Sequence, residues 1–469
     1  MLNQFLSSDI FCENLILGGG LAGLSCSFHI GHEKCLIVDQ NPYLLGHASS
    51  HFGHGVYWDE GPHVSFTKNE YVRNLLCSVA SAPLIEFSAN ISNYYYGAFI
   101  PHPVQANLGS VPDPLSTQCF NDIVSTISLS QSQKLVANYE DWLITTFGSI
   151  FTSSFPALYT QKYWTCRPNQ LTVDWVGDRI STPNLDVIRN GYCGISNHNS
   201  HYITAFRYSG EGGFQSLFAG LLPSKGHLNS KVVSIDLSSK QVTLASGATI
   251  NYKKLISTIP LNEFMLLLPD IPSPIALSID HLTCTSTYLV NITGYSSLSL
   301  PYHWTYVYDI DKLSTRITQY HLLQPSINQD GRVALQVEIY FSKYRPMTMT
   351  ESTLSSRVVE ELKDMGFIDQ VSSVSIELIK YSNIVFDHNR RESLSAIFSY
   401  LEHFGLTRED DDLLPSIQWN SPHKFDEIPV LSFAGRYAQW KYLWSDDCLL
   451  RGAQLSAMCN STEPSIFSK

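Results

Sequence analysis

The sequence predicts an α/β fold with inserted domains, and three observations support this. Two short apolar runs, at residues 14–17 and 34–39, flank a glycine-rich turn and a helix-like stretch. A block with helical periodicity covers residues 122–151, and a long middle section alternates apolar and polar residues. A strand–helix–strand unit joined to a helical block and a β-rich section is typical of an α/β protein that carries insertions.

The first unit is predicted from residues 14–39. The apolar run 14–17 is followed by three consecutive glycines and then by a stretch, 24–29, that favours a helix. A second buried strand, 34–39, ends on an acidic residue, Asp39. Two strands with a helix between them form one βαβ unit.

The inserted elements follow from periodicity. The helical block carries apolar side chains at helical spacing, namely Ile123, Val124, Ile127, Leu135, Val136, Tyr139, Trp142 and Leu143. The β-rich section predicts strands at 231–236, 241–244, 255–259, 303–308 and 333–340. Residues 351–365 predict an amphipathic helix, because Leu354, Val358, Val359 and Leu362 share one face.

The composition excludes several classes of protein. The chain has 469 residues and a formal net charge of −12, so its surface repels phosphate backbones and no nucleic-acid binding is expected. Charged residues make up 15% and aromatic residues 12%, which argues against disorder. No stretch offers about 20 uninterrupted apolar residues. No basic segment precedes an apolar one near residue 1. A soluble protein without a membrane segment is expected.

The ten cysteines are scattered, and none forms a Cys-x-x-Cys pair. A zinc ribbon or a redox dithiol is therefore not supported, and no metal site is expected. An irregular spread of thiols in a long chain is typical of reduced cysteines in a cytoplasmic protein.

The glycine-rich turn carries the clearest chemical signal. Gly18-x-Gly20-x-x-Gly23 lies between the first strand and the helix, and Asp39 ends the next strand. The first glycine permits a tight turn, the second lets backbone approach a pyrophosphate, and the third lets the helix pack on the strand. Asp39 can accept hydrogen bonds from a ribose hydroxyl. The turn predicts a bound dinucleotide with its diphosphate at the helix N-terminus.

Gly46, a few residues after Asp39, is expected where a chain must wrap the isoalloxazine ring of FAD. Further blocks lie at residues 61–66, 101–107, 163–164, 174–179, 206–213, 304–306 with Arg316, and 435–442. In order and spacing they resemble the FAD-dependent amine oxidase and protoporphyrinogen oxidase-like superfamily. Within it, the match is best to UDP-galactopyranose mutase and its relatives.

The resemblance implies a Rossmann-like FAD-binding domain with an inserted helical domain and an antiparallel β-sheet domain. The FAD-binding domain is expected from residues 1–75, 212–268 and 396–469. The sheet domain is expected from 76–103, 166–211 and 269–395, with the substrate on the side of 269–395, and the helical domain from 104–165.

The resemblance also implies FAD, active in its reduced form, and leaves NAD(P)H open as a reductant. Non-covalent binding is expected, because no Cys or His lies in an evident flavinylation motif. The implied cofactor contacts are Gly18, Gly20, Leu21, Ala22, Gly23, Asp39, Gln40, Gly46, His47, Ala48, Gly61, Val233, Gly435, Arg436, Tyr442 and Asp446.

The mutases convert a nucleotide-diphosphate sugar between pyranose and furanose forms, an isomerisation in which reduced flavin N5 attacks the anomeric carbon. A leaving diphosphate needs fixed cations, preferably planar arginine forks, and hydroxyl donors. By resemblance, the catalytic residues are His63, Arg179, Arg316 and Tyr442. The implied substrate contacts are Gln105, Trp164, Tyr306 and Asn383. The expected partner is a nucleotide-diphosphate sugar, and homo-oligomers remain open.

The sequence departs from the mutase pattern at several positions. Pro62 replaces the second glycine of the loop that precedes His63, and proline fixes φ and lacks an N–H. Asn383 stands where the mutases usually carry a tyrosine that reaches the diphosphate, and Ala106 and Thr160 replace expected asparagines. These changes weaken an assignment to UDP-galactose more than one to a nucleotide-linked sugar.

Two other functions stay open at this point. One is an FAD-dependent oxidoreductase, such as an amine oxidase, a desaturase or a protoporphyrinogen oxidase, which needs an apolar or aromatic cavity. The other is a flavin-binding protein without catalysis. Convergence of Arg179 and Arg316 on the cofactor would favour the mutase, whereas either side chain pointing into solvent would favour the oxidase.

Overall fold

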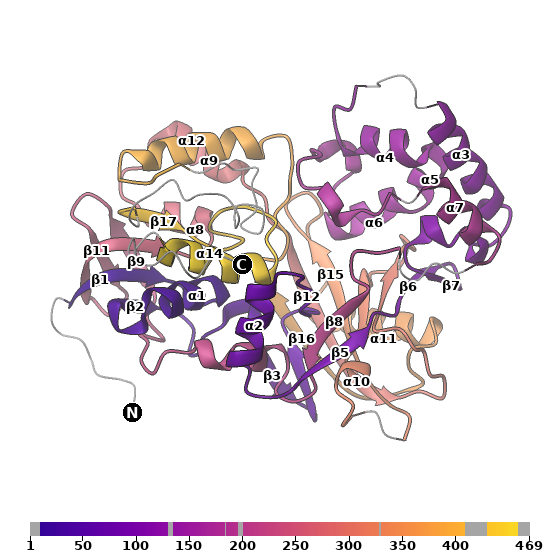
Figure 1. Cartoon of the computed structure of the whole chain (residues 1–469), viewed down its shortest axis with the longest axis horizontal. Coiled ribbons are helices and arrows are strands. Elements are labelled where there is room, and N and C mark those ends of the chain that lie inside the picture. Colours follow the sequence, from indigo (N-terminus) through magenta and orange to yellow (C-terminus); the bar gives the residue numbers. More distant parts are fainter. Residues whose placement is uncertain are drawn as a thin grey trace.

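A computed structural model describes residues 10–129, 135–182, 184–195, 200–327, 330–408 and 429–457. It confirms the predicted α/β fold and its insertions. In Figure 1, a six-stranded sheet lies on the left, a seven-stranded sheet at centre and lower right, and a group of helices at upper right.

The six-stranded sheet has the order β2-β1-β11-β10-β9, and β17 also pairs with β11. Its strands are β1 (Ile10–Leu17), β2 (Cys35–Val38), β9 (Val232–Asp236), β10 (Gln241–Leu244), β11 (Thr249–Ser257) and β17 (Leu431–Phe433). β2, β1, β11 and β17 run parallel, whereas β10 runs antiparallel to both of its neighbours, β11 and β9. Segments from all three predicted parts of the FAD-binding domain thus meet in one sheet.

Helices cover both faces of this sheet, because neighbouring strand residues point into different cores. Leu15 and Leu255 belong to the core under α8 (Leu261–Leu266), α9 (Ser273–His281) and α12 (Arg390–Glu402). Ile16 and Ile256 belong to the core that includes α1 (Leu21–Ile30), α2 (Glu70–Val79) and α14 (Ser445–Ala457). α9 therefore covers the six-stranded sheet, although its residues fall in the segment 269–395 predicted for the sheet domain (Figure 1).

The seven-stranded sheet has the order β16-β12-β15-β14-β13-β6-β7. Its strands are β6 (Ile91–Tyr95), β7 (Ala98–Pro101), β12 (Ser286–Tyr295), β13 (Trp304–Val307), β14 (Arg316–Gln319), β15 (Arg332–Phe341) and β16 (Gln370–Ile379). α11 (Glu351–Asp364) packs on it through the apolar face predicted from the sequence. The sheet is antiparallel except at β13–β6, which is parallel because these strands are far apart in the chain and no hairpin sets their direction.

The helical domain contains α3 (Leu115–Leu129), α4 (Tyr139–Phe147), α5 (Ser149–Ser154) and α6 (Pro156–Tyr163). α7 (Leu185–Tyr192) also packs here, since the rings of Phe120 and Tyr192 stack at 4.2 Å. The sequence placed α7 with the sheet domain, in segment 166–211. A contact between two distant aromatic residues leaves no periodic signal, so the sequence could not indicate this packing.

Short elements complete the chain. Two further antiparallel pairs are the hairpin of β3 (Ser50–Gly53) with β4 (Val56–Asp59) and the pairing of β5 (Leu84–Ser88) with the distant β8 (Ala205–Ser209). A short helix, α10 (Tyr320–Leu323), follows β14. The 3-10 turns are η1 (His32–Lys34), η2 (Gly46–Ala48), η3 (Val104–Ala106), η4 (Leu108–Ser110), η5 (Pro168–Gln170), η6 (Gly177–Arg179) and η7 (Phe214–Leu221). None of the helices in the described ranges is long and apolar enough to cross a membrane.

Candidate active site

One cavity of about 1000 Å³ opens where the two sheets and the helical domain meet. The glycine turn, the loop at residues 61–64, both predicted arginines and the predicted tyrosines all line it. Residues that are up to four hundred positions apart in the sequence therefore face one space.

The glycine turn forms one end of the cavity. Gly18 has φ +94°, and a Cβ on it would lie 2.5 Å from Thr258 Oγ1, so only glycine fits. A Cβ on Gly23 would lie 2.1 Å from Gly18 O, which explains the close contact of α1 with β1. A Cβ on Gly20 would meet nothing within 4 Å. Gly20 also begins α1 without a side-chain cap, so free N–H groups face open space there.

Asp39 holds this turn in place. Its Oδ2 accepts a hydrogen bond from Gly19 N at 2.7 Å, and its Oδ1 accepts one from Asn41 N at 2.8 Å. Burial raises the pKa of the Asp39 carboxyl, although these two bonds favour its charged form. Asp39 also lines the cavity, so its remaining lone pairs can accept from a ribose hydroxyl.

Gly46 lies directly beside the turn. A Cβ added to Gly46 would be 3.1 Å from Gly20 Cα, and Leu45 N donates to Gly19 O at 2.8 Å. The next residue, His47, contacts Glu60 through Nδ1 and Oε2 at 2.7 Å. Glu60 is buried, but bonds from His47 and His51 outweigh the burial and lower its pKa to about 2. The sequence analysis did not identify Glu60, a charged group on the cavity wall.

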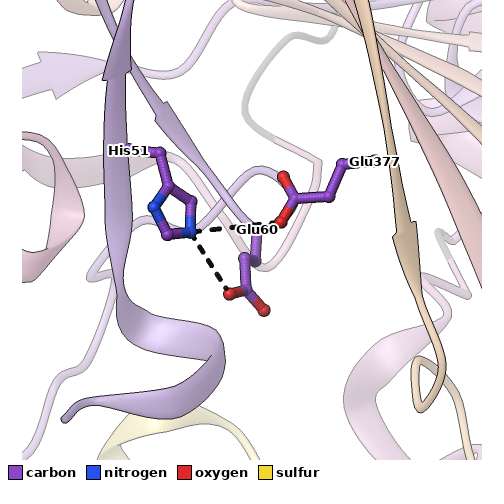
Figure 2. A group of neighbouring side chains, drawn as sticks. All are labelled: His51, Glu60 and Glu377. Atoms are coloured by element: carbon purple, nitrogen blue, oxygen red, sulfur yellow. Dashed lines mark ion pairs between the residues drawn. The ribbon is translucent and has the colours of Figure 1, made fainter. Parts of the chain in front are cut away.

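Figure 2 shows His51 between two carboxylates. Its Nε2 is 3.6 Å from Glu60 Oε1 and 4.0 Å from Glu377 Oε1. Glu377 comes from β16, so this cluster joins the β3–β4 pair to the seven-stranded sheet. These are the three residues of the described chain grouped closely enough to share a metal ion. The absence of a metal centre stays a prediction.

His63 follows Gly61 and Pro62 on the cavity wall. Its Nδ1 lies 3.0 Å from Gly61 O, and its ring stacks on Phe214 at 5.3 Å. Burial, with further contributions from Arg436 and His47, lowers the pKa of His63 to about 4, so the ring is neutral near pH 7. Because a carbonyl only accepts, Nδ1 carries the proton and Nε2 keeps a lone pair.

Arg316 and Arg179 both line the cavity rather than pointing into solvent. Arg316 lies opposite Tyr306 on β13 and opposite Glu338 on β15, and its guanidinium forms two hydrogen bonds with the Glu338 carboxylate. A Cβ on Gly61 would lie 3.7 Å from Glu338 Oε1, so the loop that carries His63 touches this ion pair. Glu338 was not identified from the sequence.

Arg179 is fixed in a different way. Its Nη1 donates to Trp175 O at 2.9 Å and its Nη2 donates to Tyr442 O at 2.7 Å. Its guanidinium also lies over the rings of Tyr442 and Trp444, at 4.7 and 4.8 Å. Planar stacking and two separate bonds position the fork without a carboxylate partner within the described chain.

A chain of hydroxyl contacts joins the predicted tyrosine to Asn383. Tyr163 Oη lies 3.1 Å from Tyr442 Oη and donates to Asn383 Oδ1 at 3.1 Å. Trp164 is buried against Trp175 and Tyr442. Gln105 donates to Ser181 O at 2.8 Å, and Tyr306 Oη accepts from Trp304 Nε1 at 3.2 Å. Tyr163 is a further wall residue that the sequence analysis did not name.

Three buried donors on the cavity wall have no hydrogen-bond partner within the described chain. They are Tyr159 Oη, Arg179 Nε and Asn383 Nδ2. An unpaired buried polar group costs about 1–3 kcal/mol. All three atoms are sealed from the cavity, so a ligand would reach them only if the wall side chains moved.

The other predicted contacts divide into two groups. Leu21, Ala22, Gln40, Ala48, Gly435 and Arg436 line the cavity with the residues above. Gly23, Val233 and Asp446 are described but do not line it. Val233 is 46% exposed, and its strand neighbour Val232 faces the cavity instead. The cofactor roles of all these residues stay predictions.

Comparison with known proteins identifies the fold. Residues 16–78 match the family model described as "NAD(P)-binding Rossmann-like domain". A crystal structure of reduced UDP-galactopyranose mutase superposes with a TM-score of 0.83 at 19% identity, covering 95% of this chain and 93% of that one. The chain has the fold of UDP-galactopyranose mutase.

Other solved structures share this fold with lower structural similarity. A protein assigned as a protoporphyrinogen oxidase from Exiguobacterium sp. 255-15 has a TM-score of 0.67 at 14% identity, covering 97% of this chain and 98% of that one. Wild-type putrescine oxidase bound to putrescine has a TM-score of 0.58 at 10% identity, covering 96% and 99%. The fold is therefore shared by proteins named as a mutase and as oxidases.

Proposed function

We propose that the chain binds FAD non-covalently in the end of the cavity formed by the glycine turn. The open space at Gly20, the uncapped start of α1 and the position of Asp39 all fit a dinucleotide. Gly46 and His47 lie where the diphosphate of FAD and its ribityl group would pass. Bound in reduced form, FAD would supply a nucleophilic nitrogen to the centre of the cavity.

We further propose that the protein is a flavin-dependent mutase acting on a nucleotide-diphosphate sugar. The observation that carries this proposal is that two arginines, Arg179 and Arg316, line one cavity. An amine or a hydrocarbon offers these guanidinium groups no negative charge, whereas a diphosphate is anionic and rich in acceptors. The likeness to UDP-galactopyranose mutase supports the same class of ligand.

Each arginine would contribute differently to holding the diphosphate. Arg179 has no carboxylate partner within the described chain and can offer its full charge. Arg316 shares its charge with Glu338, so it would act more as an oriented donor than as a net cation. Tyr442 would add a hydroxyl donor while the sugar is detached from the diphosphate, whereas the Tyr163 hydroxyl already donates to Asn383.

His63 would act as a neutral group beside the reacting atoms. Its Nδ1 proton is held by Gly61 O, which leaves Nε2 as an acceptor directed away from that carbonyl. The low pKa keeps this state constant over the physiological range. A fixed acceptor can orient an N–H or O–H donor without a change of charge.

The strongest alternative is an FAD-dependent oxidase, favoured by one observation. Much of the substrate end is aromatic, including Tyr139, Phe147, Phe151, Trp175 and Tyr308. Such a wall suits an amine or an apolar substrate as well as a nucleobase. The two hypotheses differ in redox balance, because a mutase needs reduced flavin but no net electron transfer.

The test is an incubation of FAD-loaded, dithionite-reduced protein with a panel of nucleotide sugars. The proposal predicts a furanose product, no activity of the oxidised protein and no stoichiometric use of reductant, with NAD(P)H tried as a second reductant. Peroxide formation with an amine substrate, together with no isomerised sugar, would establish the oxidase instead.

A further inference from the structure

Two histidines lie side by side on the cavity wall outside the groups discussed so far. His102 follows β7, and His201 precedes β8. Both line the cavity, and their ring centroids are 4.5 Å apart at an angle of 78°. Their hydrogen bonds determine which nitrogen of each ring carries the proton.

His102 must donate through Nδ1. This atom lies 2.9 Å from Asn93 Oδ1. The Asn93 amide is oriented by its own Nδ2, which donates to the carbonyls of Ile100 and Pro101, so Oδ1 is the acceptor toward His102. In the neutral ring, His102 Nε2 is then an unprotonated acceptor. It has no hydrogen-bond partner in the described residues and is not sealed from the cavity.

His201 has the opposite arrangement. Its Nδ1 accepts a hydrogen bond from the backbone N–H of Ile203 at 3.2 Å. The proton of the neutral ring therefore sits on Nε2, which becomes a donor. This Nε2 also lacks a partner across the described chain and is not sealed from the cavity. The two rings thus present one acceptor and one donor to the same space.

Burial keeps both rings neutral. It lowers the pKa of His201 to about 4, and it lowers the pKa of His102 well below the ordinary value, with a contribution from the neighbouring His201. Neither ring gains a proton near pH 7, so the opposite tautomers persist.

The pair lies between the His63 loop and Arg316. The His201 ring contacts Tyr202, whose ring meets Phe66 of that loop at 5.7 Å. The His102 ring is 5.0 Å from Tyr306, which lies opposite Arg316 on the neighbouring strand. If the flavin lies beside the loop and the diphosphate beside Arg316, the group between them is the sugar.

We propose that His102 and His201 form the sugar-recognition subsite and form hydrogen bonds with two neighbouring hydroxyls of the sugar. One hydroxyl donates to His102 Nε2, and the other accepts from His201 Nε2–H. A carboxylate at the same place would face the His102 lone pair with no proton to share, so the subsite selects neutral sugars over uronic acids. This inference rests on the proposed function, because it needs a nucleotide sugar in the cavity.

The test compares the Kd values of UDP, UDP-galactose and UDP-galacturonic acid for the FAD-loaded protein and for its His102→Phe and His201→Phe variants. Wild type should bind UDP-galactose more tightly than UDP. Loss of one neutral hydrogen bond should reduce this preference by about two- to tenfold in each variant. The Kd of UDP should be unchanged, and His403→Phe, at an exposed helix end, should resemble wild type.

A second measurement does not depend on the folding of the cavity variants. In ¹⁵N-histidine-labelled wild-type protein, two opposite neutral tautomers should persist from pH 6 to pH 8, with the variants used only for assignment. Equal tautomers, or an unchanged preference for UDP-galactose in both variants, would overturn the inference. If wild type bound no UDP at all, the proposed function would fail first, and the inference would fall with it.

Discussion

The two ends of the cavity are built in different ways. The cofactor end is made mainly of backbone from the turn at 18–23 and the loop at 46–48, which lie close together in the sequence. The substrate end is made of side chains from β13, β14, β15, α6, η6 and the segment that contains Tyr442. A site made of backbone restricts which residues fit, so it is recognisable in the sequence as a motif. A site made of side chains appears in the sequence only as isolated residues, whose roles depend on the fold.

Substitutions in the glycine turn should have the largest effect on the protein. They should also separate the two roles of its glycines, which are to let α1 pack closely and to let the cofactor approach the backbone. Gly23→Ala places a Cβ 2.1 Å from a backbone oxygen that cannot move alone, so the apoprotein should lose stability, by about 1–3 kcal/mol or more. Gly20→Ala meets no protein atom, so the apoprotein should keep its Tm but lose bound flavin.

Flavin absorbance per protein and the Tm of the apoprotein measure both effects. Gly226→Ala serves as the control, because its Cβ would have only a contact at 4.0 Å and its φ is not positive. A Gly20→Ala protein with full flavin content would show that no diphosphate approaches this turn.

The substrate end should be most sensitive at Arg316. Arg316→Met leaves Glu338 buried without its partner, and breaking such a pair costs about 3–5 kcal/mol. The double variant Arg316→Met/Glu338→Gln should recover much of this stability but not nucleotide binding. Urea unfolding and UDP titration measure the two quantities. Equal stability of the single and double variants would mean that the pair is not coupled.

Arg179 should affect binding more than stability, since no carboxylate depends on it in the described chain. Arg179→Ala should raise the Kd for UDP roughly tenfold to a hundredfold, which corresponds to about 1.5–3 kcal/mol for a charge-assisted bond. The flavin spectrum should stay intact, and Arg179→Lys should rescue poorly because a point charge does not reproduce the stacked fork.

Arg357→Ala is the matched control for Arg179, because Arg357 lies on α11 outside the cavity. Unchanged UDP affinity of Arg179→Ala would refute the role of this residue in holding the diphosphate.

Lys162 should give a smaller, pH-dependent effect where α6 meets the seven-stranded sheet. Its Nζ donates to Asp309 O at 2.8 Å, and burial lowers its pKa from 10.5 to about 7. Between these two pH values Lys162 is protonated in the unfolded chain and mostly neutral in the folded protein. The free energy of unfolding should therefore rise with pH, by about 2 kcal/mol from pH 7 to 9. Urea unfolding of Lys162→Met should lack this slope. An identical slope in both proteins would place the Lys162 pKa outside this range.

The contrast also explains what the sequence could predict. The Gly18–Gly23 turn and Asp39 were predicted because their spacing in a βαβ unit is fixed by backbone geometry. Several strands of both sheets were predicted from apolar runs and alternation, whereas the antiparallel sheet domain followed from the family resemblance and the strand partners were not predicted. Glu338 faces Arg316 only through the register of β14 and β15, and β6 runs parallel to β13 without a hairpin between them. The tautomers of His102 and His201 depend on neighbours that no local pattern reveals.

The central claim is that one cavity holds a flavin at its backbone-built end and a nucleotide diphosphate at its side-chain-built end. The most direct test is a titration of the oxidised, FAD-loaded protein with UDP, followed in the flavin absorption spectrum. The account predicts a saturable spectral change whose midpoint moves to higher UDP concentration in Arg179→Ala, with no change on adding putrescine. A spectrum that responds to the amine and not to any nucleotide would contradict it.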